Sequence, residues 1–221
     1  MKKEIKNIEA SIRAKLTNEA QETHRPFAEI LQYYAMERYL YRLSRSEHVD
    51  KFILKGALMF TVWQVPLRRT SLDIDFLGRF ENQISVIEAI IKDVCRQKVT
   101  PDGLLFDTAT VKCGKIKEGT AYEGVRVKFM GNLQKARISM QIDISFGDQV
   151  HPRPQIIDYP VILDFPTGTL ECFLTKNKIK TAPATLSKTA KPIEAFLENP
   201  IKAIAQKKVF KGHWKAPGPW E

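Results

Sequence analysis

Two aspartates separated by one residue lie in an apolar stretch of the chain, and this pair limits what the chain can fold into. Side chains two apart on a strand project to the same face, so we expect Asp73 and Asp75 to point together. Leu72, Ile74 and Phe76 then face the core. Two adjacent carboxylates repel each other unless a cation or a shared proton relieves them. Because oxygen ligands favour Mg²⁺ or Mn²⁺ over zinc, the pair predicts a site for one or two such ions. The alternative is a pair on a solvated strand face.

A third carboxylate falls in a second alternating segment, Arg137–Phe146. The apolar residues at every second position of this segment are Ile138, Met140, Ile142, Ile144 and Phe146. This pattern predicts a strand with one buried face. Asp143 falls on the opposite face, beside Gln141 and Ser145. If this strand pairs with the first one, Asp143 becomes a third ligand.

The composition favours a polyanionic partner and gives no indication of zinc or of a membrane. The net charge of +10 and the pI of about 9.5 suit the binding of RNA or nucleotides through phosphate neutralisation. Three cysteines without Cys-x-x-Cys spacing and four scattered histidines indicate reduced thiols and no zinc site. No apolar run approaches the ~20 residues that cross a bilayer. We therefore expect a cytoplasmic protein.

Basic residues on two predicted elements allow two interpretations each. Arg38, Arg42 and Arg45 form a stripe near the end of a helix expected to run from Pro26 to about Ser44. They either grip an RNA backbone or phosphates, or make a solvated last turn that complements the helix dipole. Arg126 and Lys128 alternate with apolar residues on a predicted strand. They either approach a triphosphate or keep an outer sheet face soluble.

The order of elements predicts an α+β domain with a mixed, mostly antiparallel sheet. Two amino-terminal helices precede a strand pair linked by a helical turn, and a further helix and a meander of strands follow. We expect an amino-terminal helical extension over residues 1–50, a core over residues 51–166 and a divergent Lys-rich tail over residues 167–221. The tail is expected to be partly disordered, because much of it has little apolar periodicity.

Several separated motifs resemble those of known nucleotidyltransferases. Gly56-Ala57, the stretch from Arg69 to Asp75 and Gln141-Ile142-Asp143 resemble the pattern of a Gly-Ser-like turn, a paired Asp and a third Asp. The motifs that resemble the AbiEii/AbiGii toxin family more closely lie at residues 27–38, 54–58, 102–104, 124–127, 146–148 and 159–160. The resemblance covers about residues 25 to 167 and implies a nucleotidyltransferase-like core.

The resemblance implies a role for each acidic residue. Asp73 and Asp75 would hold two Mg²⁺ ions that bridge the triphosphate of a nucleoside triphosphate (NTP). Asp143 would complete the cage and lower the pKa of the attacking hydroxyl. The hydroxyl would attack the α-phosphate, and pyrophosphate would leave.

The resemblance also implies nucleotide-binding residues. The turn at Lys55, Gly56 and Ala57 would present backbone amides and a helix amino terminus to the phosphates. Ser71 would bind a phosphate oxygen. Lys55 and Arg69 would contact phosphates or the transition state, and the alternative for each is a surface charge.

The carboxyl-terminal part departs from the family pattern. Members continue with a helical half that contains an Ala-Glu-Lys motif and then a Lys-Asp-containing helix near an Arg. Neither motif follows Glu171 in this chain. We therefore expect an atypical or truncated carboxyl-terminal part.

These features lead to one principal functional hypothesis and two alternatives. The first is a metal-dependent nucleotidyltransferase toxin that adds nucleotides from an NTP to RNA, at the tRNA 3′ end, and so inhibits translation. The resemblance further implies a separately encoded antitoxin that requires no stable complex. One alternative is a catalytically impaired nucleotide- or RNA-binding remnant of such a toxin. The other is nucleotidyl transfer to a small molecule or a protein.

Overall fold

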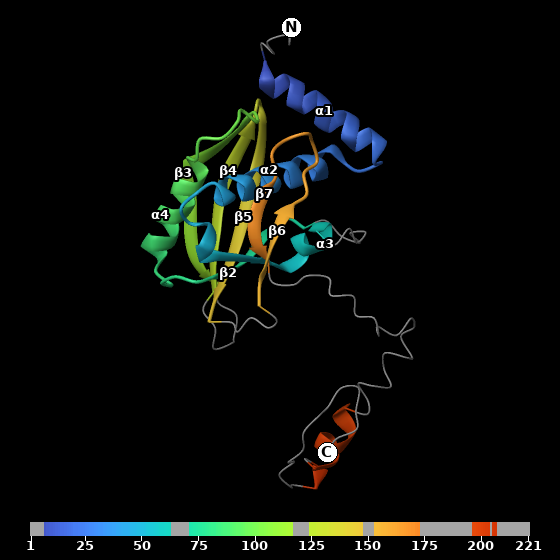
Figure 1. Cartoon of the computed structure of the whole chain (residues 1–221), viewed down its shortest axis with the longest axis vertical. Helices are drawn as coiled ribbons and strands as arrows, with labels where there is room; N and C mark the ends of the chain where they lie inside the picture. Colours follow the sequence, from blue (N-terminus) through green and yellow to red (C-terminus); the bar gives the residue numbers. More distant parts are fainter. Residues whose placement is uncertain are drawn as a thin grey trace. The chain divides into compact units, whose positions relative to one another are not determined.

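The computed structural model describes residues 7–62, 71–116, 124–147, 153–172, 196–203 and 205–206 (Figure 1). Residues 1–175 form one compact unit and residues 176–221 a second one. Within the second unit, residues 196–203 are helical. No helix in the described part of the chain has the length and apolar character needed to span a membrane.

The first unit has the predicted α+β architecture with a seven-stranded mixed sheet (Figure 1). Its helices are α1 (Ile8–Glu22), α2 (Phe27–Ser44), α3 (Met59–Val62) and α4 (Ile84–Cys95), with short 3₁₀ turns at Val49–Lys51 and Gly56–Leu58. Its strands are β1 (Phe52–Lys55), β2 (Ile74–Gly78), β3 (Leu104–Ile116), β4 (Gly124–Leu133), β5 (Ala136–Phe146), β6 (Gln155–Tyr159) and β7 (Gly168–Cys172).

The strand order is β3-β4-β5-β2-β1-β7-β6. The β2–β5 and β1–β7 pairs are parallel, and the other four neighbouring pairs are antiparallel. The predicted mixed, mostly antiparallel sheet is therefore confirmed. Strand β7 belongs to this sheet although it lies beyond residue 166, where we expected the core to end. The division into three parts otherwise stays a prediction.

Helices α2 and α4 pack on one face of the sheet and bury it. Helix α2 contacts β5 and β7, and α4 contacts β3 (Figure 1). The predicted apolar face of β5 is confirmed in this core, with Ile138, Met140, Ile142 and Ile144 all buried. The alternate residues of β5 are only partly buried or exposed. The second face of the central strands is therefore the polar one.

Both interpretations of the basic stripe on α2 are wrong for two of its three arginines. Arg38 is 1% exposed and Arg42 is 5% exposed, so neither can grip an RNA backbone or make a solvated turn. Arg38 pairs with Glu37 at 2.8 Å, and Arg42 pairs with Asp102 at 2.7 Å. Arg38 and Arg42 are therefore buried in ion pairs, and the Arg42–Asp102 pair ties α2 to the turn before β3, whereas Arg45 is exposed.

Candidate active site

Three carboxylates converge on the polar face at the centre of the sheet. Asp75 lies on β2 and Asp143 lies directly opposite it on the parallel strand β5. Asp73 stands one residue before β2 begins. Each of the three offers a carboxylate oxygen, and these oxygens all lie within 4.8 Å of one another. The structure thus brings together the three predicted acidic residues, whose role in catalysis stays a prediction.

The pKa of Asp75 reflects this crowding. Burial raises the pKa of Asp75 above its ordinary value, and the carboxylates of Asp73 and Asp143 raise it further because like charges disfavour ionisation. The Lys55 ammonium and a hydrogen bond from the Ala57 amide lower it. The pKa of Asp75 is raised on balance, and a bound cation would relieve the repulsion among the three carboxylates.

The donor set fits a hard divalent cation. All three groups are carboxylates, and each is partly buried, so the site is neither fully solvated nor sealed from water. Oxygen ligands with room for bound water suit Mg²⁺ and Mn²⁺, whereas zinc sites in proteins use mainly nitrogen and sulfur. Asp73, Asp75 and Asp143 therefore fit the ion that the family resemblance implies.

The turn after β1 is built around the Asp75 carboxylate. Gly56 has φ +72°, and a Cβ added to it would lie 2.0 Å from Oδ2 of Asp75. The Ala57 amide donates to the Asp75 carboxylate. This amide therefore positions a carboxylate in the structure, where we had expected it to face a phosphate.

Lys55 lies opposite Asp75 in the β1–β2 register and extends along the polar face. Its Nζ donates to Oγ of Ser145 on β5 at 2.7 Å. Ser145 is two residues beyond Asp143, so the Lys55 ammonium spans β2 beside the acidic cluster. The structure therefore places Lys55 at the site, and its contact with phosphate stays a prediction.

Ser71 positions the start of the acidic segment. Its backbone N–H donates to the Tyr33 hydroxyl at 3.0 Å, and its Oγ donates to Oδ1 of Asp73 at 3.2 Å. Ser71 is 5% exposed. Gln141 on β5 donates to Oδ2 of the same carboxylate at 3.5 Å. Ser71 thus orients Asp73 through a direct hydrogen bond. We had expected Ser71 to contact a phosphate, and that contact stays a prediction.

Arg126 lies at the site, but its partner there was not predicted. We expected it either to approach a triphosphate or to keep an outer sheet face soluble. It lies on β4 opposite Asp143, and its guanidinium binds both carboxylate oxygens of Asp143 at 2.8 and 2.6 Å. The alternating pattern of β4 places Arg126 on an outer face, but only the register between β4 and β5 shows what it contacts. The proximity of Tyr33 and of Ser145 likewise depends on tertiary structure.

Two predictions near the site have different outcomes. Arg69 lies outside the described residues, so its expected phosphate contact is not tested. The prediction that Leu72 faces the core is wrong, because Leu72 is 64% exposed. Strand β2 begins only at Ile74, so strict alternation does not extend back to residue 72. Ile74 and Phe76 are buried as expected.

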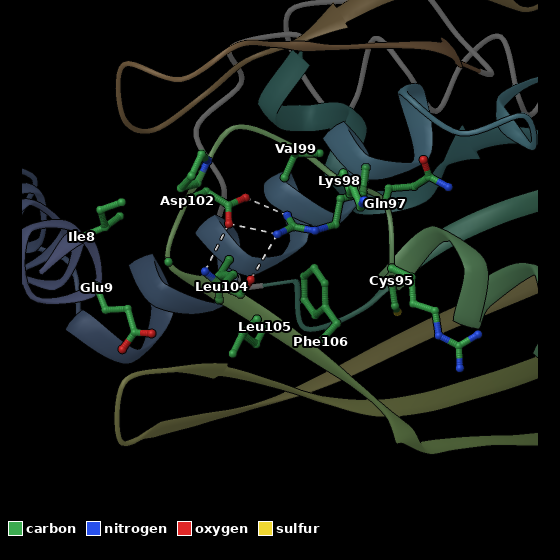
Figure 2. A pocket seen from close by; sticks show the side chains of 14 residues that line it. Ile8, Glu9, Cys95, Gln97, Lys98, Val99, Asp102, Leu104, Leu105 and Phe106 are labelled. Carbon is green, nitrogen blue, oxygen red and sulfur yellow. Dashed lines mark hydrogen bonds and ion pairs between the residues drawn. The ribbon is translucent and has the colours of Figure 1, made fainter.

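A pocket of about 710 Å³ lies at the other end of β4 from Arg126, between the starts of α1 and β3 and the end of α4. Figure 2 shows Ile8 and Glu9 on one side of it and Cys95 on the other. The Arg42–Asp102 pair lines this pocket. The Arg42 guanidinium also donates to the carbonyl oxygens of Arg38 and Leu104, so its donors are used within the fold. The Arg42–Asp102 pair therefore serves the fold at the wall of this pocket.

A second acidic group with a histidine is a poorer metal site. Nε2 of His48 lies 2.9 Å from Asp93, and Nδ1 lies 3.0 Å from the Lys51 ammonium. Because an ammonium only donates, Nδ1 accepts a hydrogen bond from Lys51. Nε2 then carries the hydrogen and donates it in a hydrogen bond to Asp93. That tautomer leaves no free lone pair on the ring for a metal.

The part of the chain that carries this site is similar to a known family. Residues 38–185 match the family described as nucleotidyl transferase AbiEii toxin, type IV TA (toxin–antitoxin) system. No curated protein sequence matches the chain. The matched span contains the acidic cluster, the Gly56 turn, Ser71 and Arg126.

Two solved structures from Helicobacter pylori are similar in fold. One is described as a nucleotidyltransferase; it is 16% identical, with a TM-score of 0.41, and the match covers 68% of this chain and 56% of that protein. The other, JHP933, is 15% identical, with a TM-score of 0.40, and the match covers 69% and 54%. The chain thus spans little more than half of either protein. The family match itself extends over well more than half of the chain, and on that basis the chain belongs to the AbiEii family of nucleotidyltransferase toxins of type IV toxin–antitoxin systems.

Proposed function

We propose that this chain transfers a nucleotide from an NTP to RNA and that the acceptor is the 3′ end of a tRNA. The observation that carries the proposal is the convergence of Asp73, Asp75 and Asp143 within 4.8 Å on the polar face of the sheet. Family membership supports the reaction class. The tRNA 3′ end as acceptor is an inference from the family resemblance, and exposed basic residues near the site favour a polyanionic acceptor.

The three carboxylates would hold Mg²⁺ or Mn²⁺. A bound ion supplies charge neutralisation for the triphosphate and orients it for in-line attack. The protein's own contribution is to fix the three ligands. Ser71 orients Asp73, and the Ala57 amide orients Asp75.

Lys55 and Arg69 are the cations that we assign to the triphosphate. The Lys55 ammonium lies beside Asp75 and reaches Ser145, so it is already on the face where phosphates would lie. Gly56 carries no side chain next to the Asp75 carboxylate. The absence of a Cβ leaves room for the Asp75 carboxylate itself, which a side chain at this position would displace.

A pair of lysines next to the site supports a polynucleotide acceptor. Lys112 on β3 and Lys128 on β4 lie directly opposite each other, and both are exposed. Like charges in directly opposed positions destabilise a sheet, and a bound polyanion removes that cost. Lys128 is two residues from Arg126, so the basic pair continues the polar face away from the acidic cluster.

We infer that the toxic effect is arrest of translation in the cytoplasm, since a nucleotide added to the tRNA 3′ end blocks aminoacylation. A type IV toxin implies an antitoxin, which we expect to be separately encoded and to act without a stable complex.

The test is transfer of label from each α-³²P-labelled NTP to total tRNA in the presence of Mg²⁺. Wild type should label tRNA, and Asp75→Asn and Asp143→Asn should lose at least about a hundredfold in rate. Asp50→Asn is the control. Asp50 is exposed on the turn before β1, whereas Asp75 lies opposite Lys55 at the other end of that strand. Circular dichroism and thermal unfolding establish that each variant is folded.

Three results would contradict the proposal in different ways. Equal labelling by wild type and Asp75→Asn removes the acidic cluster from the mechanism. Nucleotide binding by calorimetry with no labelled product identifies an impaired binding remnant. A labelled small molecule or protein, with no labelled RNA, shows that the acceptor is not RNA.

A further inference from the structure

The acidic cluster contains a cation supplied by the chain itself. The Arg126 guanidinium forms a two-pronged ion pair with Asp143, from Nε to Oδ1 at 2.8 Å and from Nη2 to Oδ2 at 2.6 Å. Both oxygens of one proposed metal ligand are therefore engaged. Paired, planar contacts of this kind are among the stronger ion pairs in proteins.

A divalent cation and this guanidinium compete for the same carboxylate. An ion bound by Asp73, Asp75 and Asp143 needs an oxygen of Asp143 that Arg126 now contacts. Two positive groups on one carboxylate repel each other, and the repulsion grows as the effective dielectric falls. Binding of the ion therefore favours withdrawal of the guanidinium.

The surroundings of Arg126 allow this withdrawal. The Arg126 side chain is 42% exposed, whereas that of Asp143 is 16% exposed, so the arginine is the more solvent-accessible partner of the pair. Its cross-strand neighbour on β3 is Gly114, and a Cβ built at Gly114 meets no atom of the described residues within 4 Å. Within the described part of the chain, the outer face of the sheet thus has room beside Arg126.

We propose that Arg126 is an exchangeable counter-ion that holds Asp143 in place before a divalent cation binds and then contacts the polyphosphate of the NTP. This inference rests on the proposed function, because it requires the cluster to bind a divalent cation. The displaced guanidinium carries five donors on a long side chain and is suited to phosphate oxygens. Arg126 would therefore oppose metal binding in the free protein and favour nucleotide binding in the metal-loaded one.

The first measurement is Mn²⁺ affinity of the full chain without nucleotide, by electron paramagnetic resonance. Arg126→Gln should bind Mn²⁺ about tenfold more tightly than wild type, because a competing charge is removed. Lys128→Gln is the matched control. It removes the same charge two residues along the same face of β4, and its effect should stay below about threefold.

The second measurement is affinity for a non-hydrolysable NTP analogue at saturating Mn²⁺. Here Arg126→Gln should bind about tenfold more weakly than wild type, so that the two effects have opposite signs. Arg137→Gln is the control, because it is the same substitution on an exposed position at the far end of β5. Arg126→Lys keeps the charge and loses the bidentate contact. Its affinities for Mn²⁺ and for the NTP analogue should lie between those of wild type and Arg126→Gln.

The outcomes separate this inference from the proposed function. If wild type binds no Mn²⁺, or if Asp143→Asn binds it as well as wild type, the proposed function and the exchange of Arg126 are both overturned. If Asp143→Asn loses Mn²⁺ binding but Arg126→Gln behaves like Lys128→Gln, the proposed function survives and the exchange does not. If Arg126→Gln fails to fold, Arg126→Lys decides, and Mn²⁺ affinity equal to that of wild type overturns the exchange.

Discussion

The carboxylate of Asp75 occupies the space that a side chain on Gly56 would need. A Cβ at Gly56 would lie 2.0 Å from Oδ2 of Asp75, and Gly56 also has φ +72°, where L side chains are strained. Two independent requirements thus select glycine at the point where β1 ends. They make the position of a proposed metal ligand depend on a missing side chain.

We therefore expect Gly56→Ala to misplace Asp75 and to lower nucleotidyl transfer by about a hundredfold, the order of loss caused by an error of about 1 Å in a reacting group. Strain at positive φ should also lower the free energy of unfolding by about 1–3 kcal/mol. The initial rate of labelling measures the loss of transfer, and urea denaturation measures the loss of stability.

Gly103→Ala is the matched control for that variant. Gly103 has φ +71°, and its added Cβ would meet Ile12 and Leu133 at 3.0 Å, at the opposite end of β4 from Arg126. It should lose stability while keeping transfer within about threefold of wild type. Equal losses of transfer in the two variants would show that stability, and not the position of Asp75, limits activity.

The second prediction concerns the anchor of Ser71. The Tyr33 hydroxyl accepts from the Ser71 amide, and Ser71 in turn donates to Asp73. Tyr33→Phe leaves a buried N–H without its partner, which costs about 1–3 kcal/mol in the free energy of unfolding. It should also weaken Mn²⁺ binding severalfold, because Asp73 loses its support.

The neighbouring tyrosine supplies the control. The Tyr34 hydroxyl donates to the carbonyl oxygen of Asp102 at 2.8 Å, away from the acidic cluster. Tyr34→Phe should therefore destabilise the fold by a similar amount and leave Mn²⁺ affinity unchanged. The role assigned to Tyr33 is wrong if the two variants bind Mn²⁺ equally well.

Alternation along single strands was enough to predict the polar and apolar faces of the sheet. Ile142 and Ile144 are buried and Asp143 points to the other face, because period-two patterns depend only on local backbone geometry. The prediction failed at Leu72, where the chain is not yet a strand. An apolar side chain there says little about burial, because single exposed leucines are common.

Contacts that depend on register could not be predicted in this way. Arg126 meets Asp143 only because β4 and β5 pair in one particular register. Arg42 meets Asp102 across sixty residues of sequence. A helical stripe of arginines resembles a solvated surface until the partner carboxylate is known, and the buried pair is visible only in the assembled core.

The third prediction tests this buried pair. Asp102 binds Arg42 through both carboxylate oxygens and also accepts from the Leu104 amide, and it is 2% exposed. Asp102→Asn leaves the Arg42 charge buried without its counter-ion, which should cost about 3–5 kcal/mol in the free energy of unfolding. Thermal and urea unfolding measure this loss.

Asp158→Asn is the control for Asp102→Asn, because it makes the same substitution at an exposed aspartate. Asp158 accepts from Thr169 in an exposed hydrogen bond between β6 and β7, so its loss should cost less than about 1 kcal/mol. If the folded fraction of Asp102→Asn binds Mn²⁺ with wild-type affinity, the pair serves the fold alone. A loss below about 1 kcal/mol for Asp102→Asn would contradict the assignment of Arg42 and Asp102 as a core ion pair.

The fourth prediction concerns the pH dependence of stability and rests on Glu37. Burial raises the pKa of Glu37 to about 7 from an ordinary value of 4.5, although Arg38 and the Ile162 amide act in the opposite direction. Below pH 4.5 the carboxyl is protonated in the folded and the unfolded chain. Between pH 4.5 and 7 the unfolded chain releases its proton first, so the free energy of unfolding falls as pH rises. Above pH 7 the loss is complete.

We therefore expect the free energy of unfolding of wild type, relative to that of Glu37→Gln, to fall by up to about 3 kcal/mol between pH 5 and pH 8, since one pKa unit corresponds to about 1.4 kcal/mol. Urea denaturation at both values measures the difference. Glu29→Gln is the control, because Glu29 lies on the same helix and pairs with Arg25 in a partly exposed position. A wild-type stability that rises between pH 5 and pH 8 relative to Glu37→Gln would mean that the ion pair with Arg38 outweighs burial and that Glu37 is ionised in the core.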